Sequence, residues 1–307
     1  MNDLSTVLAD YLALRRALGY KLQRAGQILA EFVAHLDRVG CEHITIEQTT
    51  AWATLAPDTG SSWRAQRFGA VRCFARYAQA LDARHEVPPG GLIPSGQRRV
   101  PYLYSEADVL ALLRVSSRLG SPLRSATFAV LIGLLWATGL RVGEAIRLDR
   151  DDVDLARAVI TVRKSRLGKS RLVPLHPSTA EALRGYCVLR DRLQPRHQST
   201  IFFVTRAGTR LRSGNLSTLF TEALRLAQLP PRPWVRRPRL GDLRHSFAVH
   251  TILDWHISGV DVEARLPLLS AYLGHATPAS TYWYLTASPE LLSAAARRLG
   301  HDEEDGP

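Results

Sequence analysis

Residues 268–285 read LLSAYLGHATPASTYWYL, and this stretch combines two titratable side chains with a break in a helical pattern. His275 follows an apolar run, and Tyr284 comes nine residues later. Thr277-Pro278 predicts an interruption between two helical segments, because proline disfavours helical backbone in the residue before it. The phenol of Tyr284 is a candidate nucleophile, whereas an alternative is that residues 282–284 pack as an aromatic core cluster. Upstream residues must decide between these interpretations.

Length and composition predict a globular protein with two domains. The chain has 307 residues, 46% of them hydrophobic. The longest apolar stretch, residues 126–137, is too short to span a bilayer, and the N-terminal sequence MNDLSTVLAD does not resemble a secretory signal. Three cysteines (Cys41, Cys73 and Cys187) lie far apart, in no metal-ligand spacing and in an odd number. We therefore expect a reduced, cytoplasmic protein with no disulfide framework, metal site or membrane contact.

The charge is more informative about partners. Lys and Arg number 40 against 28 Asp and Glu, which gives a formal net charge of +12. Arginine supplies most of the cations, and its guanidinium group matches phosphate oxygens with two parallel hydrogen bonds. This balance favours nucleic-acid contact, although a solvated basic surface would have the same composition.

The first part of the chain predicts a small helical domain over residues 1–87. Apolar residues recur at helical spacing, and the pair Thr45 and Gln48 is typical of a helix start. A helix from about 62 to 81 carries four arginines, which either face DNA or form an ordinary exposed surface: Arg64, Arg67, Arg72 and Arg76. Residues 88–101 are rich in Pro and Gly and predict a linker.

Residues 102–300 predict a second domain that is mainly α, followed by an acidic tail over 301–307. Ser105 and Asp108 predict a helix start, and residues 123–138 are apolar enough for a buried central helix that ends at Gly139. Two short runs rich in β-branched residues, 158–163 and 171–175, flank a polar segment and predict a β-hairpin. Further helices are expected over 178–193, over 213–229 and from about residue 242 to 255.

Two arginines of this domain are candidate phosphate ligands. Arg141 falls on a tight connection beside the apolar helix, so its charge needs a partner, which is either Glu144 or a bound phosphate. Arg244 lies in the first turn of a helix, whose positive end also attracts anions. The preceding segment, PPRPWVRRPRLGDLRHSF (230–247), holds five arginines against one acid. Its candidate DNA contacts, added to Arg64 and Arg67 of the first domain, are Arg236, Arg237 and Arg239.

Four segments in order carry a resemblance to a known family: ATGLRVGEAIRL (137–148), VRKSRLGKSRLVPLHPS (162–178), GDLRHSFAVH (241–250) and YLGHATPASTYWY (272–284). Together they resemble the tyrosine recombinase (phage integrase) family, over essentially the whole chain. The insert HISGVDVEARLP (256–267) is most similar to integrases carried by transposons. The resemblance implies an N-terminal helical core-binding (SAM-like) domain that clamps DNA and a tyrosine-recombinase catalytic domain.

The resemblance also implies a reaction without metal, cofactor or ATP. Tyr284 would attack the scissile phosphate and form a 3′-phosphotyrosyl link, Arg141 and Arg244 would hold that phosphate, and His275 would donate a hydrogen bond to it or position Tyr284. A tyrosine with a pKa of about 10 is only about one part in a thousand ionised at neutral pH, so it needs a proton acceptor. Duplex DNA with inverted half-sites would be the partner. Protomers would pair and synapse as a tetramer at the nucleoid, with residues 288–300 docking on a neighbour and accessory recombinases as further partners.

Two positions depart from the family pattern. Gly241 stands where the family has a histidine that assists proton transfer, and Arg166 aligns with the lysine that protonates the leaving oxygen. Arginine holds its proton too tightly for that role. Lys164 lies two residues before position 166, so that in a strand both side chains would point to the same face. We therefore expect Lys164 to protonate the leaving oxygen, with Lys169 as the alternative.

Three functions therefore stay open at the level of sequence. The first is an active or slow site-specific recombinase that integrates, transposes or recombines DNA. The second is a catalytically impaired DNA-binding relative, weakened at Gly241 and Arg166. The third is a helical protein-interaction module, which would need another explanation for the arginine-rich segment at 232–244.

Overall fold

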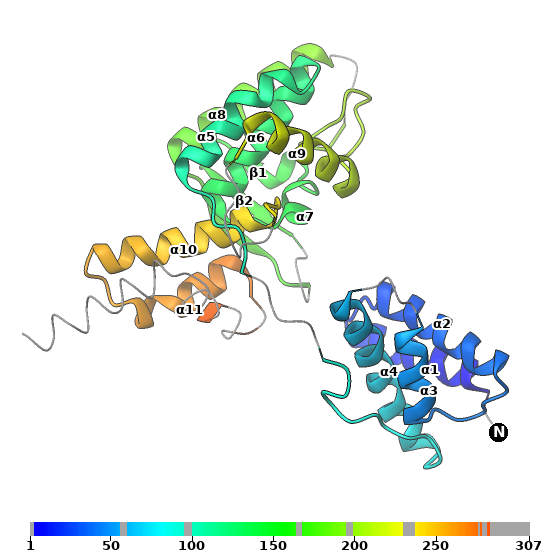
Figure 1. Ribbon diagram of the computed structural model, residues 1–307. Coiled ribbons are helices and arrows are strands. Elements are labelled where there is room, and N and C mark those ends of the chain that lie inside the picture. The colour runs from blue at the N-terminus through cyan, green and yellow to red at the C-terminus, as the bar shows by residue number, and fades with distance from the viewer. Residues whose placement is uncertain are drawn as a thin grey trace, which may run out of the picture. The chain divides into compact units, whose positions relative to one another are not determined.

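The computed structural model describes residues 3–55, 60–94, 100–163, 168–194, 199–229, 237–275, 277 and 281–282. It divides into two units, Met1–Arg98 and Arg99–Pro307, which are coloured from blue to cyan and from cyan to red in Figure 1. Each unit has a hydrophobic core of its own. The predicted mainly helical fold with a small sheet is confirmed.

The described part of the first unit contains four helices: α1 (Leu4–Ala17), α2 (Gln23–Arg38), α3 (Ile46–Thr54) and α4 (Ser61–Leu81). The long helix α4 packs against the other three. Phe32, Leu36, Val71 and Phe74 form the centre of the core, because their spacing puts apolar side chains on one face of α2 and of α4. Thr45 caps α3 by accepting a hydrogen bond from the Gln48 amide at 3.1 Å.

The second unit is organised around one buried helix, α6 (Pro122–Thr138). Ser121 caps its start, Pro122 occupies its first position, and Gly139 ends it in the left-handed conformation at φ +60°. This apolar helix packs against α5 (Glu106–Val115), α8 (Pro177–Leu193) and α10 (Asp242–Ile257), so the predicted central helix is confirmed. The remaining described helices are α7 (Val142–Ala145), α9 (Ser213–Ala227), α11 (Val262–Leu273) and two 3₁₀ turns, Ser116–Arg118 and Arg150–Asp152.

A small antiparallel sheet lies on the same core. Strands β2 (Val159–Val162) and β3 (Arg171–Pro174) form the predicted hairpin, with Val162 opposite Arg171. A two-residue strand that was not predicted, β1 (Val153–Asp154), adds to β2 and gives the order β1-β2-β3. Ile160, Val162 and Val173 point into the core.

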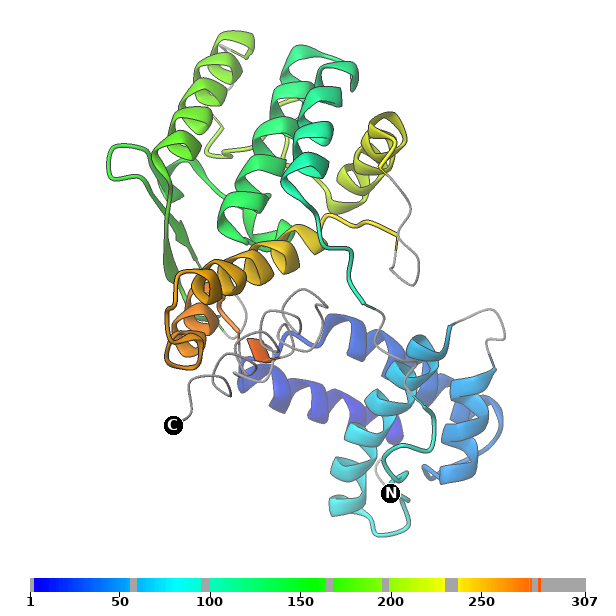
Figure 2. The same ribbon diagram turned by 60° about the vertical axis from the view of Figure 1, so that its left-hand side comes forward.

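Helices α10 and α11 run side by side and carry a second apolar cluster of the unit (Figure 2). Val249, Ile252, Leu266 and Leu269 are among its buried members. The insert at 256–267 forms the end of α10, a short turn and the first half of α11. The C-terminal end of α11 thereby returns toward the core, where it meets β3. Within the described ranges, no helix combines the length and the apolar character needed to cross a bilayer.

Candidate functional site: an arginine cluster at the end of helix α11

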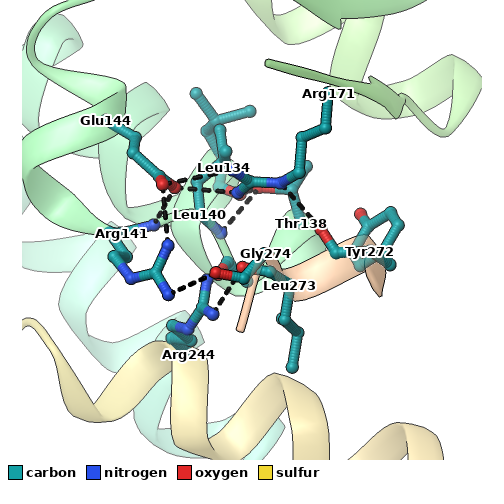
Figure 3. A network of polar contacts seen from close by, with 11 residues as sticks. Leu134, Thr138, Leu140, Arg141, Glu144, Arg171, Arg244, Tyr272, Leu273 and Gly274 are labelled. Atoms are coloured by element: carbon teal, nitrogen blue, oxygen red, sulfur yellow. Dashed lines mark hydrogen bonds and ion pairs between the residues drawn. The ribbon is translucent and has the colours of Figure 1, made fainter. Parts of the chain in front are cut away.

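Three arginines from separate parts of the second unit meet at the C-terminal end of α11 (Figure 3). They come from the residue before α7, from the start of β3 and from the first turn of α10. Two of the three, Arg141 and Arg244, are residues that the sequence singled out. The third, Arg171, is not.

Arg141 is held by the helix that follows it. Its Nη1 donates to Glu144 Oε1 at 2.8 Å, and its backbone amide donates to Glu144 Oε2 at 3.1 Å. Its Nη2 donates to the Gly274 carbonyl at 2.9 Å. The carboxylate expected as its structural partner is therefore in place, while the guanidinium group remains partly open to solvent.

Arg244 is buried, and its guanidinium group donates to two backbone carbonyls. Its Nη1 donates to Gly139 at 2.8 Å and its Nη2 donates to Leu273 at 2.6 Å. The Gly139 carbonyl can accept this hydrogen bond because the left-handed backbone of Gly139 turns the chain at the end of α6. A Cβ at this position would lie 2.5 Å from Phe247 Cδ1 on α10, so only glycine fits here.

Arg171 completes the cluster from the sheet. Its Nη1 and Nη2 donate to Glu144 Oε1 and Oε2 at 3.1 and 2.8 Å, and its Nε donates to the Tyr272 carbonyl at 2.7 Å. The sequence contained one indication of its position: side chains alternate along a strand, so residues 171 and 173 point to the same face of β3, and Val173 is buried.

The three guanidinium groups thus bind three consecutive carbonyls, those of Tyr272, Leu273 and Gly274 (Figure 3). The last carbonyls of a helix have no partner within the helix and carry its negative end. Cations are therefore stabilised here. The same groups would be available to a phosphate that competes with the carbonyls.

His275 follows directly after these carbonyls. Its Nδ1 lies 2.7 Å from Thr281 Oγ1, and its amide donates to the Ser270 carbonyl at 3.0 Å. Burial lowers the pKa of His275 to about 4, and the nearby charges of Arg244, Arg141, His245 and Arg171 contribute to the decrease. The imidazole is therefore neutral at pH 7 in this state.

Glu144 remains ionised in spite of its burial. Burial by itself disfavours the charged carboxylate, but the hydrogen bonds and charge of Arg171, together with the hydrogen bonds of Arg141, lower its pKa to about 2. The cluster therefore contains a fixed negative charge shared by two cations.

Several predicted site residues lie outside the described residues. These are Tyr284, Lys164, Arg236, the aligned position Arg166 and the segment 288–300.

Lys169 is described and exposed. Gly241 is also exposed, and a Cβ at this position would meet open space. His250 points elsewhere, with its Nε2 3.0 Å from the Tyr104 carbonyl and its ring against Trp136.

The predicted DNA contacts are placed differently in the two units. Arg237 and Arg239 are exposed in the second unit. In the first unit Arg67 is buried, and its guanidinium lies 3.7 Å from the centre of the Trp52 ring, so the expectation that it lines an exposed face of α4 is wrong. Burial lowers its pKa. Arg64 is half-buried, and its contact with DNA stays a prediction.

No group of three His, Cys, Asp or Glu residues within the described part of the chain could hold a metal ion.

Comparison with known proteins agrees with the resemblance. The profile of the phage integrase family matches residues 104–290. A Sinorhizobium fredii protein named as the integrase/recombinase y4rB is 41% identical over 314 residues, covering 99% of each chain. Tyrosine recombinase XerD of Mycobacterium tuberculosis is 32% identical, covering 85% of this chain and 82% of the relative.

Solved structures show the same fold at lower identity. The Tn1549 transposon integrase in complex with transposon right end DNA has a TM-score of 0.69 and 14% identity, and the match covers 97% of this chain and 100% of that one. The XerH recombinase bound to a palindromic difH substrate has a TM-score of 0.66 and 19% identity, with coverage of 88% and 77%.

A mainly helical unit with the four motifs in order is typical of the integrase class of proteins. The chain belongs to the phage integrase family, the tyrosine recombinases.

Proposed function

We propose that this protein is a site-specific recombinase that breaks and rejoins DNA through a covalent 3′-phosphotyrosyl intermediate on Tyr284. The observation that carries the proposal is the meeting of Arg141 and Arg244 at adjacent carbonyls beside His275. Two guanidinium groups this close can bind the two non-bridging oxygens of one phosphodiester. Without DNA, the carbonyl oxygens of Leu273 and Gly274 accept these hydrogen bonds in place of the phosphate oxygens.

The chemistry follows from the charges. The Tyr284 oxygen attacks phosphorus, the bond from phosphorus to the 5′ oxygen breaks, and negative charge grows on the non-bridging oxygens. Arg141 and Arg244 stabilise that charge. Electrostatic stabilisation of the transition state usually contributes most to the rate of such a step. The new phosphotyrosyl bond retains the energy of the cleaved bond, so a 5′ hydroxyl of another strand can reverse the reaction.

Two side chains are proposed to serve proton transfer and hydrogen bonding, His275 and Lys164. The neutral imidazole of His275 accepts a hydrogen bond from the attacking phenol or donates one to the phosphate. Lys164 delivers a proton to the leaving 5′ oxygen, with the exposed Lys169 as the alternative. Gly241 leaves the position of the family histidine without a side chain, which lowers the expected rate.

The expected substrate is duplex DNA with inverted half-sites, and we propose that a clamp domain (1–87) and the catalytic domain (102–300) each contact it. Two features support it: the net charge of +12 and the exposed Arg237 and Arg239. Among the related structures, XerH is bound to a palindromic difH substrate, and the Tn1549 integrase is in complex with transposon right end DNA. We propose that protomers pair on the half-sites and synapse as a tetramer at the nucleoid, with residues 288–300 exchanged between neighbours and accessory recombinases taking part.

The experiment begins with a duplex selected by this protein from a randomised pool. A version of that duplex with a nick beside the cleavage position loses a short fragment after attack, so that the covalent adduct accumulates. Wild-type protein is expected to form an adduct that survives denaturing electrophoresis. Tyr284→Phe is expected to bind the duplex with unchanged affinity and to form none. Binding without any adduct by the wild type would contradict the proposal.

A second candidate function is a catalytically impaired DNA-binding relative. Gly241 favours it, because the family histidine is absent and the position is empty. The combined substitution Gly241→His and Arg166→Lys is then expected to create adduct formation in a protein that forms none as wild type. An adduct with the wild-type protein would exclude this candidate.

A further inference from the structure

We propose that Arg171 is a positioning residue of the recombination reaction, which fixes Arg141 through Glu144 and fixes His275 through the end of helix α11. The inference rests on the proposed function and adds a residue to it. Arg171 differs from Arg141 and Arg244 in the kind of contact it makes, and that difference defines its role.

The contacts of Arg171 are directed into the protein. Its side chain is 12% exposed, against 31% for Arg141. It binds both oxygens of Glu144 and the Tyr272 carbonyl, at distances between 2.7 and 3.1 Å. Three of its five N–H donors are therefore used inside the protein. We infer that it stays on these partners when Arg141 turns to a phosphate.

Glu144 links Arg171 to Arg141. The carboxylate receives Arg171 on both oxygens and Arg141 on Oε1, so the two cations compete for and share one charge. With Arg171 in place, the Glu144 carboxylate is held in one orientation by both of its oxygens, and it orients Arg141 through Oε1. Without the fork of Arg171, Glu144 would have Arg141 as its remaining described ion-pair partner, and the two side chains could turn together. Arg141 would then lose its fixed position beside the phosphate site.

The second link runs along the backbone to His275. Arg171 anchors the Tyr272 carbonyl, three residues before His275, and its guanidinium also lies against Gly274. A Cβ at Gly274 would lie 3.0 Å from Arg171 Nη1, and the backbone there has φ +66°. The chain can thus pass this close to the guanidinium because residue 274 has no side chain. A displacement of 1 Å in such a site costs about 10²-fold in rate.

Lysine cannot make the same set of contacts. One ammonium group is a point charge, whereas Arg171 uses a planar fork to reach both Glu144 oxygens and, from Nε, a carbonyl on another element. Arg171→Lys therefore retains the positive charge of the pocket and removes the geometry. This substitution separates positioning from electrostatics.

The experiment uses the nicked duplex that the full chain selects from a randomised pool. Dissociation constants and single-turnover rates of adduct formation at saturating duplex are measured for wild type and Arg171→Lys. We expect the rate at saturation to fall about 10- to 100-fold, in line with the cost of misplacement. The dissociation constant should change less than about 3-fold, because phosphate and base contacts elsewhere determine affinity.

Arg190→Lys is the matched control. Arg190 is also a buried arginine on a carboxylate and a carbonyl, with Nε 2.9 Å from Asp191 Oδ1 and Nη1 2.8 Å from the Phe202 carbonyl. It lies on α8, among residues other than those of the arginine cluster. Its replacement should lower the melting temperature and leave the rate at saturation unchanged. A merely structural role of Arg171 would make the two variants behave alike.

A double-mutant cycle tests whether Arg171 acts through His275. In the His275→Ala background, Arg171→Lys should cost clearly less than in the wild-type background, because the group it positions is gone. Arg190→Lys should have the same small effect in both backgrounds. Equal costs of Arg171→Lys in both backgrounds would overturn the link to His275.

The outcomes separate the inference from the proposed function. If wild type forms no adduct, the proposed function fails. If wild type forms an adduct and Arg171→Lys forms it at the same rate, the function stands and the inference is overturned. Should Arg171→Lys not fold, Glu144→Gln removes the same link from the other side. It is expected to show the same loss of rate without loss of affinity, and an unchanged rate would overturn the inference.

Discussion

Arg141 and Arg171 bind one buried carboxylate from two sides, that of Glu144, with side-chain N–O distances of 2.8 to 3.1 Å. The two arginines belong to different elements, the start of α7 and strand β3. Their shared ion pair joins the helical core to the sheet next to the proposed phosphate site.

The first prediction concerns the acid stability of the fold. Glu144 has a pKa of about 2 in the folded protein against an ordinary value of 4.5, so its ionisation stabilises the fold above pH 4.5, and this contribution is lost as the pH falls from 4.5 toward 2. The shift corresponds to roughly 3 kcal/mol. Urea unfolding of Glu144→Gln should show a lower free energy of unfolding at pH 7 and a weaker decrease between pH 4.5 and 3 than wild type.

Glu181→Gln is the control for this measurement. Glu181 is an exposed residue of α8 that pairs with Arg184 on the surface, and such pairs contribute little to stability. Its replacement should leave the slope of stability against pH unchanged. Parallel slopes for wild type and Glu144→Gln would show that Glu144 does not have the low pKa.

The second prediction concerns the protonation of His275. Its pKa of about 4 without DNA means that the unfolded chain, with an ordinary value of 6.5, binds the proton more tightly, so His275 lowers stability as the pH falls below 6.5. Burial is the main cause of this low pKa, and a phosphate on Arg141 and Arg244 would offset the positive charges that lower it further. An NMR titration of histidine-labelled protein, assigned with His275→Asn, should show the His275 pKa rising when duplex is added. An equal or lower value with DNA would contradict a phosphate at this site.

The third prediction concerns the turn at Gly139. Alanine there would adopt a left-handed backbone, which costs about 1–2 kcal/mol, and its Cβ would overlap Phe247. Gly139→Ala should therefore lower the free energy of unfolding by more than that amount and displace the carbonyl that binds Arg244. Chemical denaturation measures the first effect, and adduct formation measures the second.

Gly185→Ala provides the opposite expectation. Gly185 lies inside helix α8, where a Cβ would meet open space. Alanine should stabilise the helix there by up to about 1 kcal/mol. If the two alanine variants changed stability alike, the special role of the Gly139 turn would be wrong.

The fourth prediction concerns the position of the absent histidine. Gly241 immediately precedes α10, and a side chain there would meet open space, so Gly241→His should fold with an unchanged melting temperature. A histidine that assists proton transfer typically contributes about 10² to 10⁴ in rate, and we expect an increase toward that range in adduct formation. Gly214→His, on α9 and also in open space, should not change the rate. No gain with Gly241→His would mean that another group already performs this transfer.

Much of the fold was readable from local patterns. The apolar run at 123–138 and the cap at Ser105 predicted α6 and α5 nearly to the residue, because helix starts, helix ends and hydrophobic spacing are encoded locally. Strand β1 was missed because two residues are too few to show an alternating pattern. Arg141 and Glu144 form an ion pair, which is one of the two alternatives that the sequence offered for Arg141, and their i,i+3 spacing at the start of a helix explains it.

The remaining errors depend on tertiary contacts. Arg67 was assigned to an exposed face of α4, but Trp52 of another helix provides an aromatic surface that retains its guanidinium in the interior. Arg171 was read only as a strand residue, because its partners Glu144 and Tyr272 are distant in sequence. Whether a charged side chain lies in water or on a partner depends on elements that meet only in the folded chain.

The double hold on Glu144 has an evolutionary consequence. When either member of a simple buried ion pair is replaced, an uncompensated buried charge remains, and the fold is strongly destabilised. In this protein, loss of one arginine still leaves the Glu144 carboxylate with the other arginine as its counterion. The fold can therefore persist after a residue of the proposed phosphate site has been lost. Under the proposed function, descendants that lose the cleavage reaction one substitution at a time are expected to keep their fold.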